Sequence, residues 1–89
     1  MGSAGGREAH AAPRNRALEK LHDELRGRTI PSREFVKLLR SAGVRMVKED
    51  SGHFVVKDEH TKSTAKVPSV GDMNHKAMGN VIRQLARQA

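Results

Sequence analysis

The spacing of the apolar residues changes at Gly43, and this change limits the fold more than any other feature of the sequence. Before Gly43, apolar side chains recur at the spacing of an amphipathic helix, at Phe35, Leu38, Leu39 and Ala42. After Gly43, apolar and polar residues alternate as they do in β-strands. A chain that changes period in this way packs a helix against strands, so we expect an α+β fold.

Two helices are expected in residues 31–89. Pro31 prevents the first from extending backwards, and Ser32 is its expected N-cap. Gly43 ends this helix, because glycine adopts a left-handed conformation at low cost. The second helix begins near Asp72 or Asn74, and its apolar residues are Met78, Val81, Ile82 and Leu85.

Three strands are expected between these helices, at 44–48, 53–57 and 63–67. A turn at 49–52 joins the first two, and Pro68 closes the third. Short connections between consecutive strands favour an antiparallel arrangement. The expected core is therefore α-β-β-β-α, with two helices on one face of a three-stranded antiparallel sheet and the other face open.

The residues before this core form two expected segments. Residues 1–12, rich in glycine and alanine, are expected to form a disordered leader. Residues 13–30 are expected to form an N-terminal helical extension, with a helix from about Asn15 to Arg26. This helix carries a narrow leucine seam, formed by Leu18, Leu21 and Leu25. A helix this short is marginal alone, so the seam needs a docking surface on this chain or on a partner.

The chain is strongly basic, with a formal net charge of +7 over 89 residues. Most of the excess lies in residues 31–89, which carry eleven basic and six acidic residues, a net charge of +5. A small basic domain of this kind indicates a polyanionic partner, most often nucleic acid. No apolar run is long enough for a membrane helix, and we expect no membrane association and a cytoplasmic location.

Most catalytic classes lack their signatures in this sequence. There is no cysteine, no phosphate-binding glycine motif and no histidine pair spaced for metal binding on a helix. We therefore expect no cofactor and no metal. Of the five histidines, three are expected to be solvated surface residues, His22, His60 and His75.

His53 is the histidine with a possible chemical role. Period-two alternation places His53 and Lys57 on the open face of the second strand, while Phe54 and Val56 face the helices. An imidazole exchanges protons near neutral pH, so it can activate the 2′-hydroxyl of RNA without a metal. The simpler interpretation is that an exposed histidine at the start of a strand is ordinary polar surface.

Four stretches of the sequence resemble the HicA family, the small mRNA-cleaving toxins of HicAB toxin–antitoxin modules. Residues 32–39, with the sequence SREFVKLL, resemble the opening helix of the family. His53 follows Gly43 by ten residues, the family's spacing between its helix-ending glycine and its catalytic histidine. The third and fourth stretches are Val67-Pro68 and the closing VIRQL at 81–85. The family reads Gly-Ser-His where this chain reads Ser51-Gly52-His53.

The resemblance implies a fold like that of double-stranded-RNA-binding domains over residues 31–89. It also implies a metal-independent endoribonuclease that cleaves mRNA and is inhibited by a HicB-like antitoxin protein. The catalytic histidine of the family corresponds to His53.

Three functional hypotheses follow. In the first, His53 is the general acid or base of a HicA-like toxin, and the RNA phosphates are bound by Lys48, Lys57 and Lys66, with Arg45 as a further contact. In the second, the same surface binds RNA without cutting it. In the third, the chain is a protein-interaction adaptor that uses the leucine seam, and its charge serves solubility.

Overall fold

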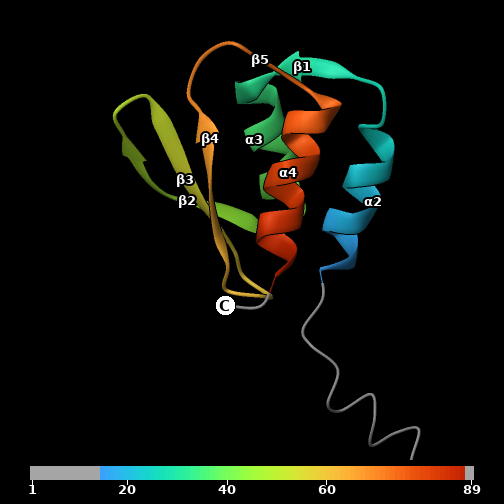
Figure 1. Ribbon diagram of the computed structural model, residues 1–89. Coiled ribbons are helices and arrows are strands. Elements are labelled where there is room, and N and C mark those ends of the chain that lie inside the picture. Colours follow the sequence, from blue (N-terminus) through green and yellow to red (C-terminus); the bar gives the residue numbers. More distant parts are fainter. Residues whose placement is uncertain (1–14, 88–89) are drawn as a thin grey trace, which may run out of the picture.

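A three-stranded sheet lies on one side of a pair of helices in the computed structural model, which describes residues 15–87 (Figure 1). The expected leader, residues 1–12, lies outside the described residues. The elements in chain order are α2 (Arg16–Glu24), β1 (Thr29–Pro31), α3 (Ser32–Ser41), β2 (Val44–Asp50), β3 (His53–Asp58), β4 (Thr64–Pro68), β5 (Asp72–Asn74) and α4 (His75–Ala86). The predicted α+β class is confirmed.

The main sheet is antiparallel, with the strand order β2-β3-β4, as expected. β2 is two residues longer than the predicted range, β3 is one residue longer, and β4 is shifted by one residue. The inward positions of β3 and β4 alternate with exposed ones, so Val56, Ala65 and Val67 are buried while Lys66 is exposed. This alternation lets the sheet contribute one face to the core and leave the other uncovered.

The helices form two further layers beside the sheet (Figure 1). α3 packs on β2 and β4, and α4 packs on β3 and β4, so both cover the same face of the sheet. α2 packs on the far side of this helix pair, against α4 and α3. Within residues 15–87, no element covers the other face of the sheet, which we call the open face.

The leucine seam of α2 is part of the core. Leu18, Leu21 and Leu25 are all buried, in the same cluster as Phe35 of α3 and Leu85 of α4. The docking surface that this seam needs is therefore provided by the rest of the chain. The adaptor hypothesis requires the seam to be exposed to a partner, and in the structure it is buried.

Asn15 fixes the start of α2 to the main sheet. As expected of an N-cap, its Oδ1 accepts a hydrogen bond from the backbone N–H of Leu18 (3.1 Å). Its Nδ2 donates to the carbonyl oxygen of Ala42 (2.5 Å) and to Oδ1 of Asp58 (3.1 Å). Asp58 is fully buried, and its Oδ1 also accepts from the backbone N–H of His60 (2.9 Å). One capping side chain thus joins three elements.

A second, two-stranded sheet was not expected from the sequence. β1 pairs antiparallel with β5, with Ile30 opposite Met73, and both of these side chains are buried. The strands have three residues each, too short to show an alternating pattern. This small sheet joins the segment before α3 to the segment before α4 at one end of the molecule (Figure 1).

The prediction that Ser32 is the N-cap of α3 is wrong. Pro31 occupies the N-cap position, and Ser32 is the first helical residue, with its side chain buried. The backbone N–H of Ser32 donates to the carbonyl oxygen of Gly71 (2.9 Å), because the β1–β5 pairing brings the two segments together. Two other predicted boundaries hold: Gly43 follows α3 with a φ of +87°, and the side chain of Asn74 caps α4. α2 ends at Glu24, two residues before the predicted Arg26.

Candidate nucleic-acid interface

Basic side chains gather on the open face of the sheet. In one cross-strand row, Lys48 and Lys66 lie on either side of Val55, and in the next row Arg45 lies opposite Lys57. Directly paired residues of an antiparallel sheet point to the same face, and neighbouring strands lie about 4.8 Å apart. Lys48 and Lys66 therefore stand about 10 Å apart at the backbone, within the same surface as the second basic pair.

A β-bulge in β2 brings Arg45 and Lys48 to the same face. Strict alternation would put residues three positions apart on opposite faces of a strand. The register of β2 on β3 shifts between Met46 and Lys48, so Val47 is an extra residue there. Met46 is paired with the buried Val56 and faces inward, and Lys48 returns to the open face.

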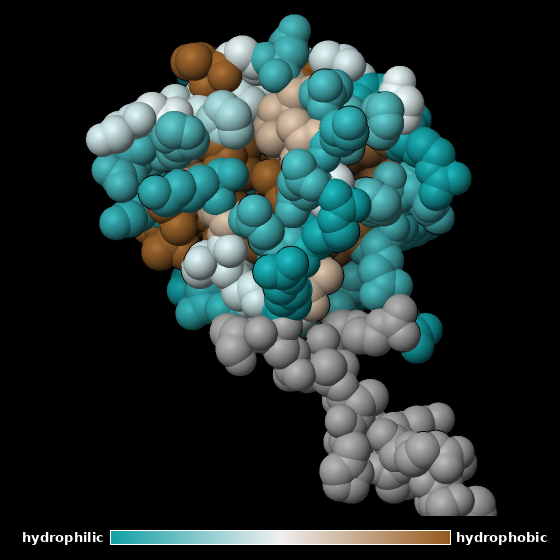
Figure 2. All heavy atoms as spheres, viewed as in Figure 1, coloured by the Kyte–Doolittle hydropathy of each residue, from teal (hydrophilic) through white to brown (hydrophobic). Residues whose placement is uncertain are grey.

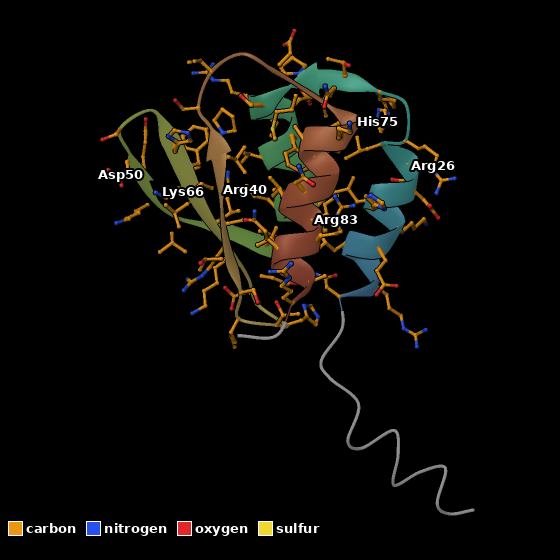
Figure 3. The ribbon with its side chains drawn as sticks, viewed as in Figure 1. Arg26, Arg40, Asp50, Lys66, His75 and Arg83 are labelled. Carbon is orange, nitrogen blue, oxygen red and sulfur yellow. The ribbon has the colours of Figure 1, made fainter. Side chains whose placement is uncertain are left out.

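The basic residues of this face differ in their pairing. Arg45 Nε lies 2.6 Å from Oε2 of Glu59, whose Oε1 lies 3.7 Å from Nζ of Lys62. Arg45 is therefore partly neutralised before any ligand binds. Among the residues that the structure describes, no carboxylate lies within ion-pair distance of the other three, Lys48, Lys57 and Lys66. Among the basic residues of this face, these lysines are therefore the ones without an ion pair within residues 15–87, and Lys57 is half-buried. In Figure 3, Lys66 lies on the sheet, on the opposite side of the molecule from Arg26 of α2.

His53 lies at the end of the same face. It is exposed, and its cross-strand neighbours are Asp50 and Pro68. Along β3, His53 is two residues, or about 6.6 Å, from Val55, which stands between Lys48 and Lys66. Within residues 15–87, no side chain forms a hydrogen bond with the imidazole of His53. The ring can therefore approach a ligand freely, but the protein does not fix its orientation.

The turn before His53 is a two-residue hairpin loop. Ser51 and Gly52 both have positive φ angles, 44° and 84°. Positive φ at both positions is the requirement of a type I′ turn, which matches the twist of the flanking strands. Ser69 strengthens the turn, since its backbone N–H and its hydroxyl both donate to the carbonyl oxygen of Gly52 (2.9 Å each). The Ser-Gly order therefore builds a regular hairpin that starts β3 at His53.

The other described histidines lie away from this face. His22 is half-buried rather than solvated, because its ring packs on α4 at Gly79, where a Cβ atom would lie 3.2 Å from Nε2. His60 is exposed as expected, with Nδ1 3.5 Å from Oδ1 of Asp58. His75 is exposed in the first turn of α4. In residues 15–87, no group of three or more acidic or histidine side chains is placed to hold a metal ion.

The open face carries no aromatic platform. Both phenylalanines of the chain point elsewhere: Phe35 is fully buried in α3, and Phe54 faces the helix side of β3. Proteins that read single-stranded RNA commonly stack its bases on aromatic side chains. This face instead offers lysine ammonium groups and one imidazole, which suit contacts to phosphate and ribose.

Two features of the structure were not predicted from the sequence. One is the Asn15–Asp58 network, which no local pattern indicates because the two residues are far apart in the chain. The other is a basic row on α3, formed by Arg33, Lys37 and Arg40, which are exposed. Their spacing of four and three residues is visible in the sequence and could have been found there.

Comparison with family models, with curated proteins and with solved structures finds no match for this chain. None of the helices within residues 15–87 is long and apolar enough to cross a membrane.

Proposed function

We propose that this chain is a HicA-like, metal-independent endoribonuclease with a fold like that of double-stranded-RNA-binding domains. RNA binds across the open face of the sheet, and His53 acts on the phosphodiester bond. A HicB-like antitoxin protein inhibits the enzyme. The observation that carries the proposal is the placement of His53 at the end of the face that collects Lys48, Lys57 and Lys66.

The reaction needs only the groups that this face and the RNA supply. His53 takes the proton from a 2′-hydroxyl, and the 2′-oxygen attacks the adjacent phosphorus. The bond from phosphorus to the 5′-oxygen of the next nucleotide breaks, leaving a 2′,3′-cyclic phosphate. The leaving oxygen takes a proton from the imidazolium or from water. Proton transfer of this kind contributes about 10²–10⁴ to the rate.

The lysines position the RNA and stabilise charge. Lys48 and Lys66 lie one row from His53, so they contact the phosphate that reacts and its neighbour. Lys57 lies one row further along β3 and binds the next phosphate. Because these contacts are to the phosphate backbone of the RNA, they carry little information about its base sequence.

Cleavage of a fluorescent RNA by the purified full chain tests the proposal, in buffer that contains EDTA. His53→Ala is expected to reduce the cleavage rate by about 10²-fold or more while RNA affinity stays within about twofold. His75→Ala, at an exposed histidine on α4, is the matched control and keeps full activity. A substrate with one 2′-deoxynucleotide stays intact at that position. Equal cleavage by the wild type and His53→Ala would contradict the proposal.

RNA binding without cleavage is the second candidate. It is favoured by the free imidazole of His53, which has no orienting partner within residues 15–87. If this candidate is correct, neither the wild type nor His53→Ala cuts the RNA. The purified chain still binds RNA, with an affinity that falls as salt is added.

A further inference from the structure

A groove runs along the other side of the sheet, between α3 and the inner surface of the β2–β3 hairpin. Its volume is about 430 Å³. The apolar residues that line it include Val36 of α3, Met46 of β2 and Phe54 of β3. Met46 pairs with Val56, and Phe54 pairs with Val67 on one side and Glu49 on the other. Because Val56 and Val67 are buried against the helices, Met46 and Phe54 are on the inward face as well. The groove therefore opens on the opposite side of the sheet from His53.

The groove exists because β2 extends beyond the helices that cover the sheet. Only Val44 of β2 is buried, and every later residue of the strand is exposed. Met46 is 38% exposed although it occupies an inward position, and the adjacent Val47 is 50% exposed. These are two of the three large apolar side chains that the structure leaves exposed in residues 15–87. Figure 2 shows apolar atoms (brown) exposed on the sheet side of an otherwise largely hydrophilic surface.

The rim of the groove is basic. Arg33, Lys37 and Arg40 of α3 line it together with one acidic residue, Glu34, which leaves a net charge of +2 on the rim. Among the described residues, none of the three basic side chains forms an ion pair. An apolar floor with unpaired cations along one side is complementary to a ligand that has both apolar and acidic groups.

The edge of β2 indicates which form this ligand takes. β2 is an edge strand, but the bulge at Val47 interrupts its regular pairing geometry. Bulges of this kind protect an edge from pairing with an additional strand. A helix satisfies its own backbone hydrogen bonds, so it can fill the groove without using the strand edge.

We infer that this groove is a docking site for an acidic amphipathic helix of a partner protein. The apolar face of the helix packs on Val36, Met46 and Phe54, and its acidic residues pair with the α3 rim. The inference goes beyond the proposed ribonuclease function and does not depend on it. Because the groove and the open face lie on opposite sides of the sheet, the helix and RNA bind at the same time.

A designed peptide tests the inference with the full chain. The probe is a helix of about 18 residues, or five turns, with leucines along one face and glutamates beside them. A scrambled peptide of the same composition and a version with lysine in place of glutamate are the controls. Methyl NMR reports binding, since Met46 is exposed while Met73 and Met78 are buried. The acidic helix is expected to shift the Met46 methyl signal, and the two control peptides are not.

Substitutions separate this groove from the open face. Arg40→Glu is expected to weaken binding of the acidic helix about tenfold or more. Lys66→Glu, on the opposite side of the sheet, changes the peptide affinity less than about twofold. Equal binding of the scrambled peptide would overturn the inference. Displacement of the peptide by an RNA hairpin would assign the groove to RNA, and a Met46 shift that depends only on protein concentration would assign it to a second copy of this chain.

Discussion

The two faces of the main sheet are built from the same three strands, yet packing determines the residues of only one of them. The inward face carries residues that packing requires, such as Val56 and Val67, which are almost completely buried. The open face carries Lys48, Lys57 and Lys66, on the side of the sheet that the helices do not cover. Folding therefore explains the composition of the inward face and leaves that of the open face unexplained.

The open face also carries a pair of like charges that lowers the stability of the sheet. Lys57 lies directly opposite Arg45 across two strands, and like charges in this position destabilise a sheet. Glu59 relieves the repulsion in part through its ion pair with Arg45. The proposed binding of RNA to this face would account for the unfavourable pairing. The following tests compare buried positions with exposed ones and end on the open face, in order of decreasing effect on stability.

The largest effect is expected for Val67→Asp, on the inward face of β4. Val67 has no exposed surface, so the new carboxylate would be buried without a partner. We expect a loss of about 4 kcal/mol or more, close to the whole stability of a small domain. Lys66→Asp places the same residue one position earlier, on the open face, and should leave the chain folded. Circular dichroism and a two-dimensional NMR spectrum distinguish these results, and equal stability of the two variants would contradict the assignment of the faces.

A second test asks whether α2 shares the core with the sheet and helices. Leu18 is 1% exposed, so Leu18→Ala should lower the free energy of unfolding by about 2–5 kcal/mol. Lys20→Ala, on the exposed side of the same helix, should change it by less than about 0.5 kcal/mol. Both values come from urea denaturation. A small effect of Leu18→Ala would show that α2 is an appendage rather than part of one cooperative unit.

Much of the fold could be predicted because local rules agree with tertiary packing. Asn15 and Asn74 are predicted and observed as helix caps, and Gly43 is predicted and observed at the end of α3. The small β1–β5 sheet could not be predicted, since two segments more than forty positions apart must meet to form it. That pairing also displaced the predicted cap at Ser32.

The candidate site was only partly predictable for a similar reason. Alternation correctly placed His53, Lys57 and Lys66 on one face, because β3 and β4 are regular. The bulge at Val47 depends on how β2 pairs with β3, and no period in the sequence reveals it. Without the bulge, Lys48 would face the helices rather than the other lysines.

A third test compares two helix caps. Asn15→Ala removes the cap of α2 and also the hydrogen bonds to Ala42 and Asp58, so we expect a loss of about 2 kcal/mol. Asn74 is exposed and accepts a hydrogen bond from the backbone N–H of Ala77. Asn74→Ala should therefore cost about 1 kcal/mol. Thermal or urea denaturation measures the difference, and equal losses would show that the network around Asp58 adds nothing beyond capping.

The smallest effect on stability is expected on the open face, for Lys57→Gln. Removing one of two like charges that face each other should change the free energy of unfolding by less than about 0.5 kcal/mol, and in the stabilising direction. The same substitution removes a phosphate contact, so the slope of log affinity for RNA against log salt should become shallower by about 0.7–0.9. Lys76→Gln, on α4, removes an equal charge from another part of the surface and should leave the slope unchanged. If both variants change the slope equally, only net charge matters and the open face has no special role. If Lys57→Gln alone changes it while the stability holds, the charge on this face serves RNA binding and not folding.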